Sequence, residues 1–293
     1  MSSDKKEHNN TTRDRAKLGA RKETKMFIPN KNERISTLLY MSTPTIPKSE
    51  FFSFLTMALE QNSMPTFAAD EQLKENLYSL TTRMLDVNEH MNLTTIREWH
   101  DIIMRHYVDS LTVAAHIPQG ATVLDIGCGA GFPSLPLALA RPDLNVTAID
   151  STEKKIRYVA ETASLLGLSP RRLTARAMRA EEGGAPGGEL REKFNIVVSR
   201  AVAKLSVLGE LALPCLTVGG QLLALKGERA EEEVAEFKGY ALLGATAATV
   251  LPTPISRPDS EEIDRHALVM IEKIEKTPKI YPRKYAQILK KPL

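Results

Sequence analysis

The chain has 293 residues, of which 42% are hydrophobic and 26% charged, as in typical globular proteins. It contains no run near the roughly 18 apolar residues that span a bilayer, which argues against a membrane-spanning helix. Two cysteines, Cys128 and Cys215, without metal-ligand spacing exclude a disulfide framework and a structural metal site. These features predict a cytoplasmic protein that binds neither a membrane nor a metal ion.

The charge is unevenly distributed along the chain. Residues 1–34 carry ten basic and five acidic side chains, and residues 272–293 carry seven basic and two acidic side chains. Each end therefore has a net charge of +5, although the whole chain has a net charge of only +3. Basic ends suit a polyanion such as nucleic acid, because Lys and Arg that neutralise phosphates release counterions. Solvated tails would explain the same pattern, so charge alone leaves both interpretations open.

The N-terminal part of the chain is expected to consist of an extension followed by helices. Residues 1–48 are polar, contain three prolines and lack apolar periodicity, which predicts disorder. Residues 49–118 are expected to form a helical cap, with a short helix over 50–60 and an N-cap at Asp70. Two sets of apolar residues at helical spacing support it: Leu73, Leu77, Leu80 and Met84, and then Ile102, Ile103, Tyr107, Val108, Leu111 and Val113.

From Pro118 onwards strands and helices alternate. The expected strands are 122–126, 146–149, 173–175, 195–198, 221–225 and 267–274, and the expected helices are one from about 133 and those at 153–166, 205–213 and 230–237. Repeated βα units predict an α/β domain with a doubly wound, mostly parallel sheet over 119–276. Residues 277–293 remain as a basic C-terminal tail.

A glycine-rich turn lies between the first expected strand and its helix. Gly127, Gly129 and Gly131 allow a sharp turn and a close approach to a ligand at the strand ends, where doubly wound sheets bind ligands. Phe132 occupies the position of the third glycine in the dinucleotide fingerprint, which disfavours a dehydrogenase.

Two acidic residues indicate the ligand. Asp125 would repel a pyrophosphate but can organise the loop and attract the cationic methionyl group of S-adenosylmethionine. Asp150, at the end of the next strand, is placed to accept hydrogen bonds from both ribose hydroxyls. The alternative is a glycine-rich turn without a ligand, with Asp150 as a helix cap.

The sequence downstream provides no nucleophile or general base. Cys215 lies in an apolar segment rather than at the end of the fourth strand, which favours a buried core cysteine. Ser199 and Arg200 stand at that strand end instead. Such a site suits an acceptor that needs no deprotonation, such as guanine N7, and catalysis then depends on positioning and exclusion of water.

With these residues in place, the sequence resembles the bacterial 16S ribosomal RNA guanine-N7 methyltransferase G family, also called the glucose-inhibited division protein B family. The resemblance covers roughly residues 50–275 and implies a seven-stranded, Rossmann-like S-adenosylmethionine-dependent methyltransferase. The motifs that carry it are Asn92-Leu93-Thr94, Arg105-His106, Asp109-Ser110-Leu111, DIGCGAGFPSLPLA from Asp125, Arg179-Ala180-Glu181-Glu182, Val198-Ser199-Arg200-Ala201 and Leu225-Lys226-Gly227.

The resemblance also implies site residues and partners. No residue is assigned as catalytic, and Arg200 is the candidate for positioning beside the reacting centre. The expected partner is 16S ribosomal RNA or the small ribosomal subunit, with the protein acting as a monomer and flipping the guanine into the site. The cofactor contacts are expected at Gly127, Phe132, Ala180, Glu181 and Arg200, to which the strand argument adds Asp150.

Several interpretations stay open at this point. His106 and Asp109 either contact the guanine or its phosphate, or are satisfied polar groups of a packed helix. Lys226 either faces a phosphate or is structural, whereas Trp99 is expected to be a packing residue. A non-catalytic RNA-binding factor for ribosome assembly and a small-molecule methyltransferase are the alternative functions, because fold alone does not define the substrate.

Overall fold

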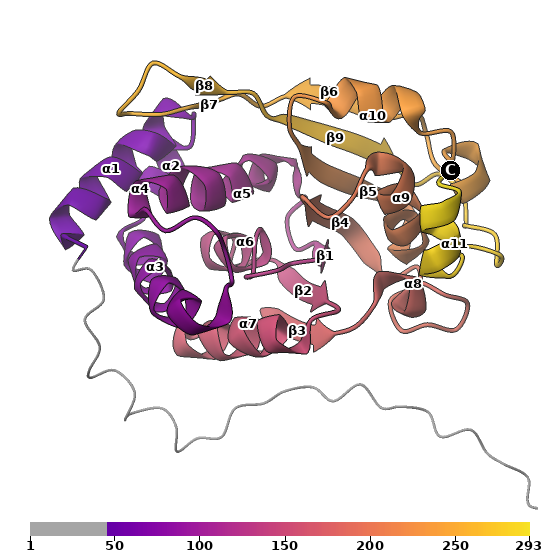
Figure 1. Ribbon diagram of the computed structural model, residues 1–293, viewed down its shortest axis with the longest axis horizontal. Coiled ribbons are helices and arrows are strands. Elements are labelled where there is room, and N and C mark those ends of the chain that lie inside the picture. The colour runs from indigo at the N-terminus through magenta and orange to yellow at the C-terminus, as the bar shows by residue number, and fades with distance from the viewer. Residues whose placement is uncertain (1–45) are drawn as a thin grey trace, which may run out of the picture.

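The computed structural model describes residues 46–293, which form a helical N-terminal part, a central sheet and helices on both faces of that sheet (Figure 1). The expected disordered extension, 1–48, lies almost entirely outside the described residues. None of the described helices is both long and apolar enough to cross a membrane.

The first part of the cap is formed by α1 (Lys48–Gln61), α2 (Pro65–Ala68) and α3 (Glu71–Met91). Asp70 is the N-cap of α3, and its Oδ1 accepts a hydrogen bond from the Leu73 backbone N–H at 2.9 Å. The expected apolar face of α3, including Leu77 and Leu80, is fully buried. The local sequence signals for this helix are therefore confirmed.

The second part of the cap is a helical run from Trp99 to His116 that changes type along its length. It consists of α4 (Trp99–Ile102), the π-helical η2 (Ile103–Val108), α5 (Asp109–Thr112) and the 3-10 helix η3 (Val113–His116). The sequence predicts a helix here but not the π-helical turns. Such turns are rare and often occur at functional sites, and this one carries His106.

Within the described residues, seven strands form one sheet in the order β3-β2-β1-β4-β5-β9-β6. Neighbouring strands are parallel from β3 to β5, and β9 is antiparallel to both β5 and β6. This arrangement confirms the expected α/β, doubly wound, seven-stranded and mostly parallel sheet. The strands are β1 (Thr122–Ile126), β2 (Asn145–Asp150), β3 (Leu173–Ala177), β4 (Phe194–Arg200), β5 (Leu216–Lys226), β6 (Thr249–Pro252) and β9 (Ala267–Glu272).

Side chains alternate between the two faces of the sheet and divide the core into two clusters. On β1, Val123 belongs to one cluster and Leu124 to the other. The first cluster is covered by α6 (Ser134–Ala140), α7 (Glu153–Leu165) and the cap, and the second by α8 (Ala180–Gly183), α9 (Leu205–Ala212) and α10 (Ala230–Glu236).

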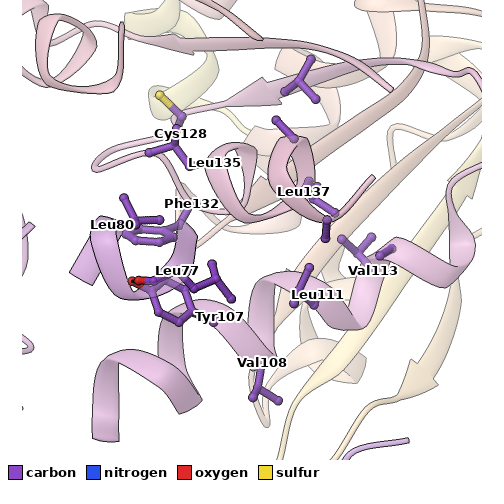
Figure 2. Packing of buried hydrophobic residues seen from close by; sticks show 14 of the residues in the cluster. Leu77, Leu80, Tyr107, Val108, Leu111, Val113, Cys128, Phe132, Leu135 and Leu137 are labelled. Atoms are coloured by element: carbon purple, nitrogen blue, oxygen red, sulfur yellow. Dashed lines mark hydrogen bonds between the residues drawn. The ribbon is translucent and has the colours of Figure 1, made fainter. Parts of the chain in front are cut away.

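The cap packs directly on α6. Figure 2 shows Leu135 and Leu137 of α6 in the same cluster as Leu77 and Leu80 of α3 and Tyr107 of η2. The Tyr107 hydroxyl lies 2.6 Å from Thr81 Oγ1, which satisfies both buried groups. The cap therefore packs against the helix that directly follows the glycine-rich turn.

Several short elements have no counterpart in the sequence analysis. They include the edge strand β6, the hairpin of β7 (Ile255–Ser256) and β8 (Ile263–Asp264), and the 3-10 helices η4 (Leu213–Cys215) and η5 (Ala241–Leu243). An edge strand that is only half buried lacks a continuous apolar run, which is the signal that identifies a central parallel strand. The C-terminal segment 277–293 contains α11 (Tyr285–Lys290), where Ile288 is fully buried.

Candidate active site

The glycine-rich turn after β1 is held by its own backbone. The N–H groups of Gly127 and Cys128 both donate to the Ile149 carbonyl of β2, at 2.9 and 3.0 Å. Gly127 and Gly129 have positive φ values of 72° and 56°, a conformation that L side chains rarely adopt. At Gly127 a Cβ would also lie 2.5 Å from a Val202 methyl group. The turn therefore needs glycine for both conformation and space.

Asp150 connects this turn to the start of α7. Its Oδ2 accepts a hydrogen bond from Gly129 N at 3.1 Å, and its Oδ1 accepts one from Thr152 N at 2.8 Å. Each carboxylate oxygen keeps a second lone pair. The N-cap of α7 is Thr152, and no side chain caps this helix, so Asp150 is not the helix cap of the alternative interpretation. Asp150 fixes the turn and the residue before α7, and it retains acceptors for a diol such as a ribose.

Asp125, near the end of β1, connects that strand to the start of α6. Its side chain is completely buried, and its Oδ2 accepts a hydrogen bond from Ser134 N at the start of α6. Burial raises the pKa of this carboxyl to about 7. Asp125 does not line the cavity above the turn, so it organises the loop as expected, whereas direct contact with a cationic ligand group does not follow from its position.

A cavity of about 590 Å³ lies over the turn, and we call it the glycine-loop cavity. Its size and position at the carboxyl ends of the strands suit a nucleoside-sized ligand. The structure brings all six sequence-predicted site residues to its wall: Gly127, Phe132, Asp150, Ala180, Glu181 and Arg200.

The backbone at Gly129 tests whether S-adenosylmethionine fits this cavity. A Cβ added at Gly129 would have no neighbour nearer than the Gly127 carbonyl oxygen, 4.0 Å away, although the residue lines the cavity. An added side chain would therefore project into the space for the ligand. A backbone cradle beside a carboxylate with free lone pairs fits the nucleoside and amino-acid parts of S-adenosylmethionine.

At one end of the glycine-loop cavity, two side chains pack on the Phe132 ring. The His106 ring stacks on Phe132 with 4.3 Å between ring centroids and an interplanar angle of 13°. The Arg200 guanidinium lies 5.2 Å from the centre of the same ring. This group connects η2, the glycine turn and the end of β4.

The hydrogen bonds of His106 establish its tautomer. Arg200 Nη2 lies 3.1 Å from His106 Nδ1, and because a guanidinium can only donate, Nδ1 must accept. Nε2 therefore carries the proton and donates to Thr94 Oγ1 at 3.2 Å. Burial, aided by the Arg200 charge, lowers the pKa of His106 to about 3, so the ring is neutral at physiological pH.

Arg200 forms an ion pair with the buried Asp109. Arg200 Nη1 lies 3.1 Å from Asp109 Oδ2 and also donates to the Arg105 carbonyl at 2.5 Å. His266 Nδ1 lies 3.0 Å from Asp109 Oδ1. Burial alone would raise the pKa of Asp109, but the His266 hydrogen bond and the Arg200 charge hold it below its usual range. The same hydrogen bond raises the pKa of His266.

A second cavity, of about 600 Å³, adjoins the first, and we call it the charged cavity. The two share a wall made of Thr94, His106, Arg200, Ala201 and Val202. The remaining lining residues come from distant parts of the chain: Thr95, Ile96, Arg105, Asp109, Ala203, Leu225, Lys226, Gly227, Glu233 and His266.

Lys226 and Glu233 form a second, partly buried ion pair in the wall of the charged cavity. Lys226 Nζ lies 2.8 Å from Glu233 Oε2 and donates to the Ala203 carbonyl at 2.6 Å. The same Glu233 oxygen accepts a hydrogen bond from Leu205 N at 2.7 Å. Lys226 is thus engaged in fixing the turn after β4, which favours the structural interpretation of this residue.

The structure also shows the surroundings of the other open residues. His106 and Asp109 are satisfied, buried polar groups that also line the charged cavity. Trp99 stacks on His100 and contacts Phe54, which confirms its packing role. His266 also lines the charged cavity, and the sequence gives no signal for it, because a single histidine before a strand, far in sequence from Asp109, carries no motif.

The observed strand order, the antiparallel β9, the glycine turn after β1 and Asp150 after β2 together define a Rossmann-like, S-adenosylmethionine-dependent methyltransferase. S-adenosylmethionine is the methyl donor of this class. Phe132 and Arg200 line the end of the cavity next to the charged cavity, while Ala180 and Glu181 lie beyond Asp150 after β3.

The chain belongs to the family described as rRNA small subunit methyltransferase G, whose model matches residues 73–253. A relative from Lactobacillus johnsonii named ribosomal RNA small subunit methyltransferase G is 38% identical over 232 residues, covering 78% of this chain and 94% of the relative. A relative of the same name from Limosilactobacillus fermentum is 41% identical over 243 residues, covering 81% and 93%. A solved S-adenosylmethionine-dependent O-methyltransferase from Thermotoga maritima is 14% identical, with a TM-score of 0.43 over 67% of this chain and 72% of that one.

Proposed function

We propose that this protein transfers the methyl group of S-adenosylmethionine to N7 of a guanosine in 16S ribosomal RNA, within the small ribosomal subunit. The observation that carries the proposal is the charged cavity, which meets the glycine-loop cavity at Arg200. A base in the charged cavity would lie next to the end of the glycine-loop cavity lined by Phe132 and Arg200. The names of the relatives support ribosomal RNA as the acceptor.

The groups around the charged cavity support a nitrogen acceptor that needs no deprotonation. Asp109 and Glu233 are paired with Arg200 and Lys226, and His106 is neutral with both ring nitrogens in hydrogen bonds. A carboxylate held in an ion pair, with its pKa below the usual range, is a weak general base. Guanine N7 has a free lone pair and does not need one.

The reaction is then a direct displacement. When bound, S-adenosylmethionine supplies an electrophilic methyl group on a sulfonium. The N7 lone pair forms the new C–N bond while the C–S bond breaks, and the sulfur keeps that electron pair. The positive charge moves to the guanine ring and no proton leaves. His106 and Arg200 contribute by forming the shared wall, which packs on Phe132, and by excluding water.

The chemistry of the cavity also favours an RNA strand over a neutral small molecule. The Arg105 side chain is exposed at the rim of the charged cavity, so its guanidinium is accessible to a phosphate of the strand that carries the base. Arg forms bidentate hydrogen bonds with phosphate oxygens.

An isotope-transfer assay tests this function. Small subunits from cells that lack the endogenous enzyme are incubated with the protein and methyl-labelled S-adenosylmethionine, and the RNA is then treated with borohydride and aniline. We expect the label in 16S RNA and strand cleavage at one guanosine, because N7-methylguanosine becomes labile after reduction. Label without cleavage would refute N7. No label in subunits or naked RNA would favour a non-catalytic factor or a small-molecule enzyme.

A further inference from the structure

The C-terminal segment 277–293 is bound to the catalytic domain by charged groups. Glu210 of α9 is fully buried, and its Oε1 accepts hydrogen bonds from both the backbone N and Nε of Arg283 at 2.8 Å. Arg283 Nη2 donates to Glu210 Oε2 at 2.5 Å. A buried carboxylate with a fork of donors from one arginine is a strong, directional contact.

A second arginine holds the start of the same segment. Arg191 donates to the carbonyl of Thr277 at 2.5 Å and to that of Tyr281 at 2.8 Å. Beyond these contacts, α11 lies beside α9 (Figure 1) and inserts Ile288 into the core. The segment therefore has a defined position, although the sequence distinguishes it only by its basic composition.

This position brings one aromatic side chain to the glycine-loop cavity. Tyr285, the first residue of α11, lines that cavity together with Met178, Arg179, Ala180, Glu181 and Leu211. The Arg179 guanidinium lies 5.7 Å from the centre of the Tyr285 ring. The ring thus stands beside the segment that follows β3.

The end of the cavity near Tyr285 is the end expected to hold the adenine. Asp150 after β2 is placed for the ribose, and Phe132 and Arg200 lie toward the charged cavity, where the methyl group must point. The base of the nucleoside then extends past Asp150 toward Ala180 and Tyr285. A purine at that end meets an aromatic face or edge, which is a favourable contact.

We propose that Tyr285 contacts the adenine of S-adenosylmethionine, so that the C-terminal segment is part of the co-substrate site. This inference rests on the proposed co-substrate but not on the identity of the acceptor. Arg283 and Glu210 act at a distance from the ligand by fixing the segment that carries Tyr285.

Calorimetric titration with S-adenosylhomocysteine tests the contact without any RNA. We expect Tyr285→Ala to weaken binding about tenfold, since base–aromatic stacking is lost. Tyr285→Phe should stay within about twofold of wild type, because the ring rather than the hydroxyl makes the contact. The matched control is Leu289→Ala on the same helix, which is 52% exposed and outside the cavity, and should bind as wild type.

A fluorescence titration keeps the inference falsifiable if the alanine variant folds poorly. The chain has a single tryptophan, Trp99, which packs against Phe51 and Phe54 and lines neither cavity. We expect S-adenosylhomocysteine to change the emission of Tyr285→Trp and to leave that of the wild type unchanged.

The inference would be overturned if Tyr285→Ala bound S-adenosylhomocysteine with wild-type affinity, or if S-adenosylhomocysteine did not change the emission of Tyr285→Trp. Failure of the wild type to bind S-adenosylhomocysteine would instead refute the co-substrate itself. Tight, Tyr285-dependent binding without RNA methylation would leave this inference intact and refute the proposed acceptor.

Discussion

The two adjoining cavities are built in different ways. The wall of the glycine-loop cavity comes largely from short stretches that directly follow β1, β2 and β3, and its turn is held by backbone hydrogen bonds. The charged cavity is lined by side chains from distant segments, held by the pairs of Asp109 with Arg200 and of Lys226 with Glu233. Local turns therefore form most of the glycine-loop cavity, to which tertiary folding adds His106, Arg200 and Tyr285, whereas the charged cavity depends on tertiary folding throughout.

The largest effect is expected from breaking the ion pair between Arg200 and the buried Asp109. Arg200→Ala leaves Asp109 buried with only His266 as a charged partner, and such a loss costs about 3 kcal/mol of unfolding free energy. Urea denaturation measures it, and methyl transfer should be lost as well. Arg229→Ala is the control, since its pair with Glu232 is exposed and its removal should not move the unfolding midpoint. If the Arg200→Ala protein were as stable as wild type, the claim that this ion pair holds the wall of the charged cavity would be wrong.

The next effect is the pH dependence that His106 adds. Its pKa in the folded protein is lowered from 6.5 to about 3, so only the unfolded chain takes up a proton in that window. Stability therefore falls as the pH drops below 6.5, by up to about 1.4 kcal/mol per pH unit from this group. Asp125, with its raised pKa, has the opposite slope over part of this range, so the measurement is the difference in slope between wild type and His106→Gln. Equal slopes would show that His106 is protonated in the folded protein.

A smaller effect is expected in the glycine turn. Gly129→Ala puts a side chain at φ 56°, which costs about 1 kcal/mol of stability, and also places a methyl group in the co-substrate space, which should weaken S-adenosylhomocysteine binding about tenfold. Gly120→Ala, at φ 72° with open space around it, should show a comparable loss of stability with unchanged affinity. If both variants bind equally well, the turn is not a cradle for the ligand.

The smallest effect concerns Cys128 in the same turn. Its side chain is buried, and burial raises the pKa of its thiol well above the usual value, so it is an unreactive packing group. Because the turn acts through its backbone, Cys128→Ala should keep S-adenosylhomocysteine affinity within about twofold by calorimetry. A larger loss of affinity would mean that this thiol contributes directly to the site.

The difference between the cavities also explains what the sequence could predict. Strands β1 and β2 are short and largely apolar segments between turn residues, and the positions of Gly127 and Asp150 follow from where these two strands end. The resemblance supplied Phe132, Ala180, Glu181 and Arg200, all of which line one cavity.

The remaining features of the site could not be predicted, because they leave no pattern in the local sequence. The contact between Asp109 and His266 joins two segments that only the folded sheet brings together. The π-helical turns of η2 and the docking of Tyr285 likewise depend on tertiary packing rather than on the periodicity of the sequence around them. A solvated basic tail and a helix docked through Ile288 are indistinguishable by charge alone.

The most direct test of the account is to fill the charged cavity without disturbing the other one. Gly227 lines only the charged cavity, is exposed and has no atom within 4 Å of an added Cβ, so Gly227→Phe should fold normally. We predict that it binds S-adenosylhomocysteine within about twofold of wild type but transfers methyl groups to small subunits about a hundredfold more slowly, because the acceptor base is excluded. Gly227→Phe with wild-type methyl transfer would contradict the assignment of the charged cavity to the acceptor.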